Sequence, residues 1–369
     1  MAIALLSLCI WVYLFAAHGR FWSSSPELAA AQPREYPDVD VIVPARDEAH
    51  TIAAVIGSLL AQDYAGKFRV TLVDDNSSDD TVRLAGSAAN LQVLRLTAKP
   101  DRWSGKLWAL SQGLGATSAP LVLFADADIV HDPRHVSTLV AKMQNARLGM
   151  VSEMVHLKCD SFAERALIPA FIYFFQMLYP FAKVNDPRSK LAAAAGGTIL
   201  VRRDVLAQIG GLEAINETLI DDVALARAVK KVDGIFLGHS GLARSIRPYP
   251  DFADIWRMIT RTAYTQLHFS LVLLCLTLAG LTLVWWVPVW EVLFGSDISR
   301  AFGAAGCVLA ALSYQPTLRR YRRSPLWALA LPLIAAFYMA ATLGSAINYW
   351  RGTGAQWKSR SYEKDSGRS

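Results

Sequence analysis

The sequence predicts an α/β fold with a doubly wound, mostly parallel sheet, flanked by membrane segments. Between residues 38 and 268, short apolar runs alternate with stretches of helical periodicity, and the connections are short. Such alternation is typical of strands joined by crossover helices. Longer apolar runs lie on either side, within residues 1–20 and 269–350. The 369-residue chain is 53% hydrophobic, which is high for a soluble protein and indicates membrane segments.

Four strands are predicted in the first half of the central region, and polar stretches follow them. Apolar residues at helical spacing predict a helix within residues 52–60, and residues 105–116 are a second candidate. Pro44 is expected to end the first strand. The four strands cover residues 39–43, 69–73, 91–96 and 121–124. Because ligands bind beyond the carboxyl ends of parallel strands, the polar side chains at those ends are the candidate site.

Two carboxylates, Asp126 and Asp128, follow the fourth strand one residue apart. Side chains two residues apart in a strand point to the same side, so the pair is expected to share one cation. A small set of oxygen ligands suits Mg²⁺ or Mn²⁺ carried in with a phosphate-bearing substrate. The alternative is a simple turn, since Asp and Pro are common where strands end. Acidic clusters at two earlier strand ends, residues 46–48 and 74–75, favour the binding site.

A further acidic pair, Asp221 and Asp222, begins a helical pattern. Carboxylates at that place also stabilise a helix N-terminus, so a purely structural role stays open. Upstream, Gly196 and Gly197 interrupt an apolar run. Paired glycines there indicate either close approach of the backbone to a ligand or a bulge.

The membrane segments are predicted from length and flanking charge. The run at residues 3–17 has its first positive charge after the apolar stretch, which favours an uncleaved anchor over a signal peptide. The runs at 269–290 and 324–350 are long enough to cross a bilayer at about 1.5 Å per residue, whereas 301–318 is marginal. Residues 166–182 contain two prolines and are expected to lie at the membrane interface.

The net charge of +6 lies partly beside these apolar runs, as at residues 319–323. That placement favours anionic lipid over nucleic acid as the partner. Arg257 and Arg261 lie one turn apart beside apolar residues, which predicts a basic amphipathic helix at the membrane surface. The basic tail, residues 351–369, should stay on the cytoplasmic side, yet three full crossings from a cytoplasmic domain would place it outside. One of the runs is therefore a candidate re-entrant segment.

Five motifs occur in an order that resembles glycosyltransferase family 2. They are Val41-Ile-Val-Pro-Ala-Arg-Asp-Glu48, Val73-Asp-Asp-Asn-Ser-Ser-Asp79, Gly105-Lys106, Asp126-Ala-Asp128 and Asp221-Asp222. The resemblance covers about residues 38–268 and implies a GT-A fold, an inverting reaction and a nucleotide-sugar donor, by the family's habit a UDP-sugar. The layout of the whole chain, with Trp103-Ser-Gly-Lys106 and Arg244-Ser-Ile-Arg-Pro-Tyr249, resembles the hopene-associated subgroup. That narrower resemblance implies a lipid-like acceptor such as a hopanoid, at the cytoplasmic face of a bacterial-type inner membrane.

The family resemblance also implies contacts with the donor. Glu48 and Asp75 would contact the nucleoside, and Lys106 the diphosphate or the sugar. Arg257 and Arg261, the basic residues near the membrane segments, would also contact the donor. The complete set of expected nucleotide-sugar-binding residues is Pro44, Glu48, Asp75, Lys106, Asp126, Arg257 and Arg261.

Metal binding and catalysis are assigned by the same resemblance. Asp126 and Asp128 would sit at the metal, with Asp128 the direct ligand. Asp222 matches the family's catalytic aspartate, while Asp221 replaces the usual glutamate before it. This departure leaves open which of the two acids is the base.

Two other functions are considered. Related membrane enzymes carry Gln-x-x-Arg-Trp near the bilayer, and this chain has Met258-Ile-Thr-Arg-Thr262 instead. The missing Trp argues against a processive polysaccharide synthase, which is the alternative enzyme. The alternative of another class is a non-catalytic membrane protein that binds nucleotide sugars. Carboxylates at every expected motif position argue against it.

Overall fold

The computed structural model describes most of the chain, and its contacts divide the chain into two compact units. The described residues are 1–97, 99–101, 103–216, 218, 220–353, 356–357 and 360–361. The first unit, called the sheet unit here, comprises Ser25–Lys158, Val184–Pro248 and Gln356–Ser369. The second, called the helical unit, comprises Met1–Ser24, Cys159–Lys183 and Tyr249–Ala355. Most of the predicted basic tail, residues 351–369, lies outside the described residues.

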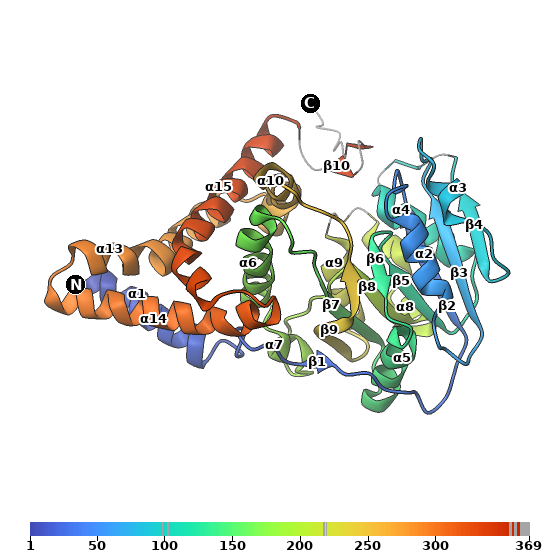
Figure 1. The fold of residues 1–369 in the computed structure, drawn as a ribbon, viewed down its shortest axis with the longest axis horizontal. Coiled ribbons are helices and arrows are strands. Elements are labelled where there is room, and N and C mark those ends of the chain that lie inside the picture. Colours follow the sequence, from blue (N-terminus) through green and yellow to red (C-terminus); the bar gives the residue numbers. More distant parts are fainter. Residues whose placement is uncertain are drawn as a thin grey trace. The chain divides into compact units, whose positions relative to one another are not determined.

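The described part of the sheet unit is built on a nine-stranded mixed sheet (Figure 1). Its strands run in the order β1-β9-β7-β8-β5-β2-β3-β4, and β6 pairs with β9. Strand β2 is parallel to β3 and β5, and β9 is parallel to β1 and β7, while β8 is antiparallel to both of its neighbours. The predicted α/β fold with a mostly parallel sheet is confirmed. The strands are β1 Glu27–Leu28, β2 Val39–Ala45, β3 Phe68–Asp74, β4 Leu91–Arg95, β5 Leu121–Ala125, β6 Ile129–His131, β7 Met150–His156, β8 Thr198–Arg202 and β9 Ile235–Ser245.

Helices connect these strands and bury their apolar faces. Every residue of β2 and β5 is buried, as expected of central strands covered on both faces. Helix α4 lies close against the sheet: a Cβ added to Gly113 would stand 2.5 Å from Ile42 Cγ2 and 2.9 Å from Val73 Cγ2. Only glycine permits this approach. The helices are α2 Ile52–Leu60, α3 Thr81–Ala85, α4 Gly105–Gly115, α5 His135–Ala146, α8 Arg203–Gln208, η1 Leu212–Ile215 and α9 Asp221–Val229.

Strand β2 continues through Pro44 to Ala45, so the prediction that Pro44 ends the strand is wrong. Pro44 still pairs with Val73 of β3, whereas the described ladder between β2 and β5 stops at Ile42. Proline has no N–H to donate, and it is tolerated in a strand where one side has no ladder partner.

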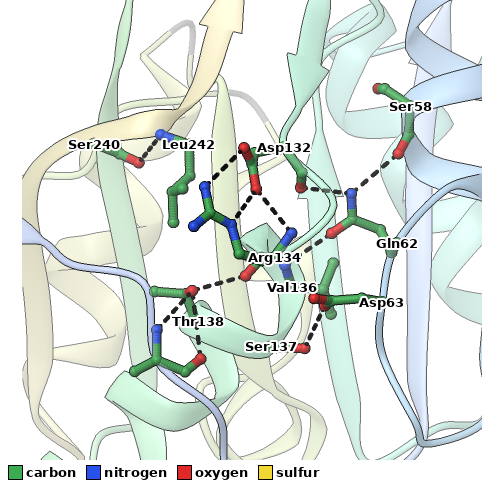
Figure 2. Close-up of polar contacts among 11 residues, drawn as sticks. Ser58, Gln62, Asp63, Asp132, Arg134, Val136, Ser137, Thr138, Ser240 and Leu242 are labelled. Carbon is green, nitrogen blue, oxygen red and sulfur yellow. Dashed lines mark hydrogen bonds and ion pairs between the residues drawn. The ribbon is translucent and has the colours of Figure 1, made fainter.

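Side-chain hydrogen bonds fix the segment after β6 (Figure 2). Gln62 Nε2 donates to the carbonyl oxygens of Ser58 (3.0 Å) and Asp132 (2.9 Å), and Gln62 Oε1 accepts from the backbone N–H of Val136 at 2.9 Å. These bonds tie the end of α2 to the start of α5. The turn at residues 126–128 lies upstream, between β5 and β6.

The helical unit contains two segments that, within the described chain, are long and apolar enough to cross a membrane: Leu271–Phe294 and Pro325–Trp350. They correspond to the outer two predicted C-terminal runs. The N-terminal helix α1 spans 15 residues, which is shorter than a full crossing. The elements are α1 Ala2–Ala16, α6 Phe162–Leu178, α10 Phe252–Thr260, α11 Ala263–Gln266, α12 Leu271–Leu281, η2 Thr282–Trp286, α13 Val287–Phe294, α14 Asp297–Arg320, η3 Pro325–Ala330 and α15 Leu331–Trp350.

Most of residues 166–182, predicted to lie at the membrane interface, form part of α6. Tyr173 of α6 is fully buried, and its hydroxyl group lies 2.6 Å from Ser313 Oγ. Its ring packs edge-on against Tyr314 and Trp285, at centroid distances of 5.0 and 6.2 Å. Helix α6 therefore belongs to the core of the helical unit, and its placement at an interface stays a prediction. Helix α7, Phe181–Asn185, lies where the chain passes back to the sheet unit.

Candidate active site

A small pocket in the sheet unit collects predicted site residues from four separate chain segments. Pro44 comes from β2, Lys106 from the first turn of α4, Asp126 from the end of β5, and the pair Asp221 and Asp222 from the start of α9. All five were predicted as donor-binding or catalytic residues. The rest of the lining is mostly apolar: Leu107, Leu110, Phe124, Ala125, Gly196, Ile199, Leu212, Ile215 and Leu225.

Lys106 is the central cation of this pocket. Its Nζ lies 2.8 Å from Asp126 Oδ1 and 3.5 Å from Asp221 Oδ2. Burial alone would lower the pKa of the Lys106 ammonium, but the two carboxylates outweigh burial and raise that pKa above its usual value. Ser104 caps α4 by accepting a hydrogen bond from the Leu107 N–H, which fixes the helical turn that carries Lys106. Lys106 thus keeps its positive charge in this pocket.

Asp222 is the acid best suited to proton transfer. Burial, reinforced by the charge of Asp221, raises the pKa of Asp222 to about 7. A carboxylate with a pKa near neutrality can accept a proton and release it again. Its Oδ1 accepts a hydrogen bond of 2.7 Å from the Val223 N–H at the start of α9, which holds the side chain at the helix N-terminus.

Gly196 leaves the space in front of these charges open. A Cβ at this position would stand 3.2 Å from Asp222 Oδ2 and 3.4 Å from Lys106 Nζ. Any larger side chain would therefore intrude between the acid and the ammonium. Of the two interpretations of the paired glycines, close approach of the backbone to a ligand fits this geometry.

Asp126 and Asp128 face different cations. Strand β5 ends at Ala125, and the Ile129 N–H donates to the Asp126 carbonyl oxygen at 3.2 Å, so the two acids sit in a turn. The prediction of a shared cation assumed that both acids lie in a strand, and that assumption is wrong. Asp126 pairs with Lys106, whereas Asp128 Oδ2 lies 2.5 Å from Arg247 Nε.

Arg247 also joins Asp128 to a third acid. Its Nη2 lies 2.6 Å from Glu48 Oε1, so one guanidinium bridges the loop after β2 and the turn after β5. Arg247 was not among the predicted site residues. Its signal was its place in the motif at residues 244–249, which begins in the last two residues of β9.

Glu48 and Asp75 are held by two interlocked loops. Arg46 Nη1 donates to the Asp75 carbonyl oxygen at 2.7 Å and lies 3.5 Å from Asp75 Oδ2, and Asp75 is 1% exposed. The Ser78 N–H donates to Asp47 Oδ1 at 2.7 Å, which ties the loop after β3 to the loop after β2. Arg46 is a second site-adjacent cation without a predicted role.

Arg257 and Arg261 belong to the helical unit and are not among the described lining residues of the pocket. Arg257 lies on α10 and pairs with Asp254, one turn earlier on the same helix. Arg261 directly follows α10. The amphipathic helix predicted here exists, with Ile255 and Ile259 buried.

The carboxylates fit a divalent cation only together with further ligands. In the described part of the chain, no group of three or more His, Cys, Asp or Glu side chains is arranged to hold a metal ion. Asp126 and Asp128 offer oxygen donors, the type that Mg²⁺ and Mn²⁺ prefer. An ion bound there would need phosphate oxygens or water to complete its coordination.

Comparison with known proteins identifies the region that carries part of this pocket. Residues 40–210 match the model of the family described as glycosyl transferase family 2. Residues 40–210 therefore form a glycosyl transferase family 2 domain. The match includes Pro44, Lys106 and both acids of the Asp126–Asp128 turn, and it ends just before α9.

Two curated relatives extend the comparison. An N-acetylglucosaminyltransferase of Bradyrhizobium elkanii is 34% identical over 119 residues, covering 31% of this chain and 63% of that protein. A beta-monoglucosyldiacylglycerol synthase of Trichormus variabilis is 26% identical over 293 residues, covering 68% of this chain and 60% of that protein. The chain thus spans less than two thirds of the length of either relative.

A solved structure supports the architecture of the family 2 domain. The mannosyltransferase from Pyrobaculum calidifontis, in complex with GDP-Man and Mn²⁺, aligns with a TM-score of 0.53 at 20% identity. The alignment covers 92% of this chain and 98% of that chain. At this identity the likeness concerns the fold, and the predicted GT-A-like fold is confirmed.

Proposed function

We propose that this protein is an inverting, metal-dependent hexosyltransferase that moves a sugar from a UDP-sugar to a lipid-like acceptor. The observation that carries the proposal is the pocket of the sheet unit. There a permanently charged Lys106 lies among three acids, and one of these, Asp222, has a pKa near neutrality. Such a site can neutralise a leaving diphosphate and remove a proton from an acceptor hydroxyl.

Asp222 is the proposed base. The acceptor oxygen attacks the anomeric carbon from the face opposite the diphosphate, as in inverting glycoside chemistry. As the new C–O bond forms, the bond to the diphosphate breaks and the hydroxyl proton passes to Asp222. The charge of Asp221 raises the pKa of Asp222, which strengthens Asp222 as a proton acceptor. Asp221 is thus a tuning residue in this scheme.

The leaving group is stabilised by fixed charges. Lys106 faces the pocket from the N-terminus of α4, where an anion is also favoured by the helix dipole. A divalent ion bound by Asp128 and Asp126 would neutralise the two departing phosphates. Pro44 shares the pocket lining with these groups, and we assign it to the wall of the donor site.

The nucleoside is assigned to the loops after β2 and β3. Glu48 and Asp75 are buried there and held by the interlocked loops described above. Carboxylates of this kind accept hydrogen bonds from ribose hydroxyls and base N–H groups.

The lipid-like acceptor is supported by the rest of the chain. Two segments of the helical unit are long and apolar enough to cross a membrane, and the matched relative of Trichormus variabilis is named a beta-monoglucosyldiacylglycerol synthase. Arg257 and Arg261 would hold the enzyme against anionic lipid or the donor. We assign residues 1–20 to an anchor, 38–268 to a cytoplasmic catalytic domain and 269–350 to the membrane region of a multi-pass inner-membrane protein. A hopanoid and a diacylglycerol are the acceptors to test.

The test is transfer of label into lipid. Membranes that contain the protein are incubated with radiolabelled UDP-sugars, hopanoid or diacylglycerol, and Mn²⁺, and lipids are then extracted. The proposal expects label in an organic-soluble product of inverted anomeric configuration, lost in Asp222→Asn. Label confined to a long polymer would instead identify a processive synthase. Saturable donor binding without turnover would identify a non-catalytic binding protein.

A further inference from the structure

Arg247 forms ion pairs with two acids of the site, and the proposed chemistry does not use it. One guanidinium spans two carboxylates, with Nε at 2.5 Å from Asp128 Oδ2 and Nη2 at 2.6 Å from Glu48 Oε1. The side chains of Asp128 and Glu48 are only 13% and 11% exposed, so both charges depend on a nearby cation.

The position of Arg247 is built into the sheet. Strands β6 and β9 pair with Ile129 opposite Ser245, and the Ile246 N–H donates to the Asp128 carbonyl oxygen at 2.9 Å. The backbone of residue 247 therefore lies close to Asp128 whichever side chain it carries. An arginine here reaches the Asp128 carboxylate because of backbone register, and its long side chain can turn elsewhere without moving β9.

The carboxylate that Arg247 occupies is the one assigned to the metal. A divalent cation of the Mg²⁺, Mn²⁺ or Ca²⁺ type binds carboxylate oxygens at about 2.0–2.6 Å. The same oxygen of Asp128 cannot hold a guanidinium nitrogen at 2.5 Å and a metal ion along the same direction. Two cations side by side would also repel each other in a partly buried site.

We propose that Arg247 is an internal counter-ion of the metal site, which competes with the divalent ion for Asp128. This inference rests on the proposed function, because it takes Asp128 as a metal ligand. The ion alone meets a site already neutralised by Arg247 and binds weakly. When a nucleoside diphosphate arrives with the ion, its phosphates offer the displaced guanidinium a new anionic partner of matching, bidentate geometry. Arg247 thereby makes metal binding depend on the nucleotide.

Arg46 provides a matched control. It is an arginine of the same site, and its described ion pairs are with Asp47 and Asp75 rather than with the Asp126–Asp128 turn. Arg46→Gln removes one positive charge from the region without releasing the proposed metal ligand. Comparison of the two substitutions separates direct competition for Asp128 from a general gain in negative charge.

The experiment measures Mn²⁺ binding by the purified full-length protein in detergent. Free Mn²⁺ is followed by its electron paramagnetic resonance signal, with Mn²⁺ alone and with Mn²⁺ plus UDP. We expect Arg247→Gln to bind Mn²⁺ alone about tenfold more tightly than the wild type, as expected for loss of one charge-assisted pair. Arg46→Gln should change the affinity by about twofold or less, and Arg247→Lys, which keeps the charge, should stay near the wild type. UDP should strengthen Mn²⁺ binding less in Arg247→Gln than in the wild type.

Two results would overturn the inference. The first is that Arg247→Gln and Arg247→Met, both checked for folding by thermal unfolding, bind Mn²⁺ no more tightly than the wild type. The second is that Arg46→Gln gains as much Mn²⁺ affinity as Arg247→Gln. If the wild type shows UDP-promoted Mn²⁺ binding in the same experiment, only the counter-ion role fails. If the wild type binds no Mn²⁺ even with UDP, the metal assignment of the proposed function fails as well.

Discussion

Neutralising Asp221 should shift the pH dependence of sugar transfer towards acid without abolishing transfer. In the wild type the pKa of Asp222 is about 7, raised first by burial and then by the charge of Asp221. A base acts only when deprotonated, so kcat/KM should fall about tenfold per pH unit below that pKa. Asp221→Asn removes the neighbouring like charge. It also releases Lys106, whose ammonium lies 3.5 Å from Asp221, to stabilise ionised Asp222 more strongly.

The size of the shift follows from these values. At about pH 6, one tenth of Asp222 is ionised in the wild type, and near pH 8 about nine tenths. A like charge within a few ångströms is worth about one pKa unit in a site that already contains a cation. The variant should then be about half ionised near pH 6. Its kcat/KM should exceed that of the wild type about fivefold there and match it near pH 8.

The assay is release of nucleoside diphosphate from the best sugar nucleotide, measured as kcat/KM across the pH range. This ratio reports the ionisation of the free enzyme. Asp222→Asn is the companion variant and should lose transfer at every pH while it still binds UDP. The reasoning is refuted if Asp221→Asn abolishes transfer and Asp222→Asn retains it, because the base would then be Asp221. An unshifted acid limb in an active Asp221→Asn would refute the electrostatic part.

Three further predictions concern stability. Gly113→Ala should destabilise the fold by about 1–3 kcal/mol in chemical unfolding, since the new Cβ overlaps Ile42, whereas Gly115→Ala on the same helix, with no described heavy atom within 4 Å of the added Cβ, should not. Asp40→Ala should cost about 2–4 kcal/mol, because buried Asp40 accepts the N–H groups of residues 118 and 119 at 2.9 and 2.7 Å. Burial holds the pKa of His131 well below its usual value, so the unfolded chain binds a proton at a higher pH than the folded chain does. The free energy of unfolding should therefore fall by up to about 1.4 kcal/mol for each pH unit below about pH 6.5. In His131→Gln it should fall less steeply.

Local patterns in the sequence were enough for strands β2, β3, β4 and β5 and for part of the pocket. The apolar runs at residues 39–43 and 121–124 predicted β2 and β5, because buried strands need uninterrupted apolar side chains. Polar residues at the ends of such strands converge at one edge of the sheet, which is why Asp126 could be placed in the candidate site before the structure was known. Lys106 was assigned to the site by the family resemblance. The family resemblance added the pair at the start of α9.

Long-range pairing could not be predicted from local patterns. Arg247 meets Glu48 across 199 residues and Asp128 across 119, and both contacts depend on the register between β6 and β9. The motif at residues 244–249 marked the segment, but nothing in that motif indicates which acids Arg247 meets. Local pattern also left two alternatives at Asp126 and Asp128, a shared cation and a simple turn. The structure has the turn, because β5 ends at Ala125, before either acid.

The most direct test of the account is metal-dependent release of nucleoside diphosphate by the purified protein. Wild type and Asp128→Ala are compared with a panel of sugar nucleotides, with Mn²⁺ and after chelation. The account predicts release by the wild type only when Mn²⁺ is present, and loss of release in Asp128→Ala despite normal folding. Full turnover by Asp128→Ala, or undiminished release by the chelated wild type, would contradict it.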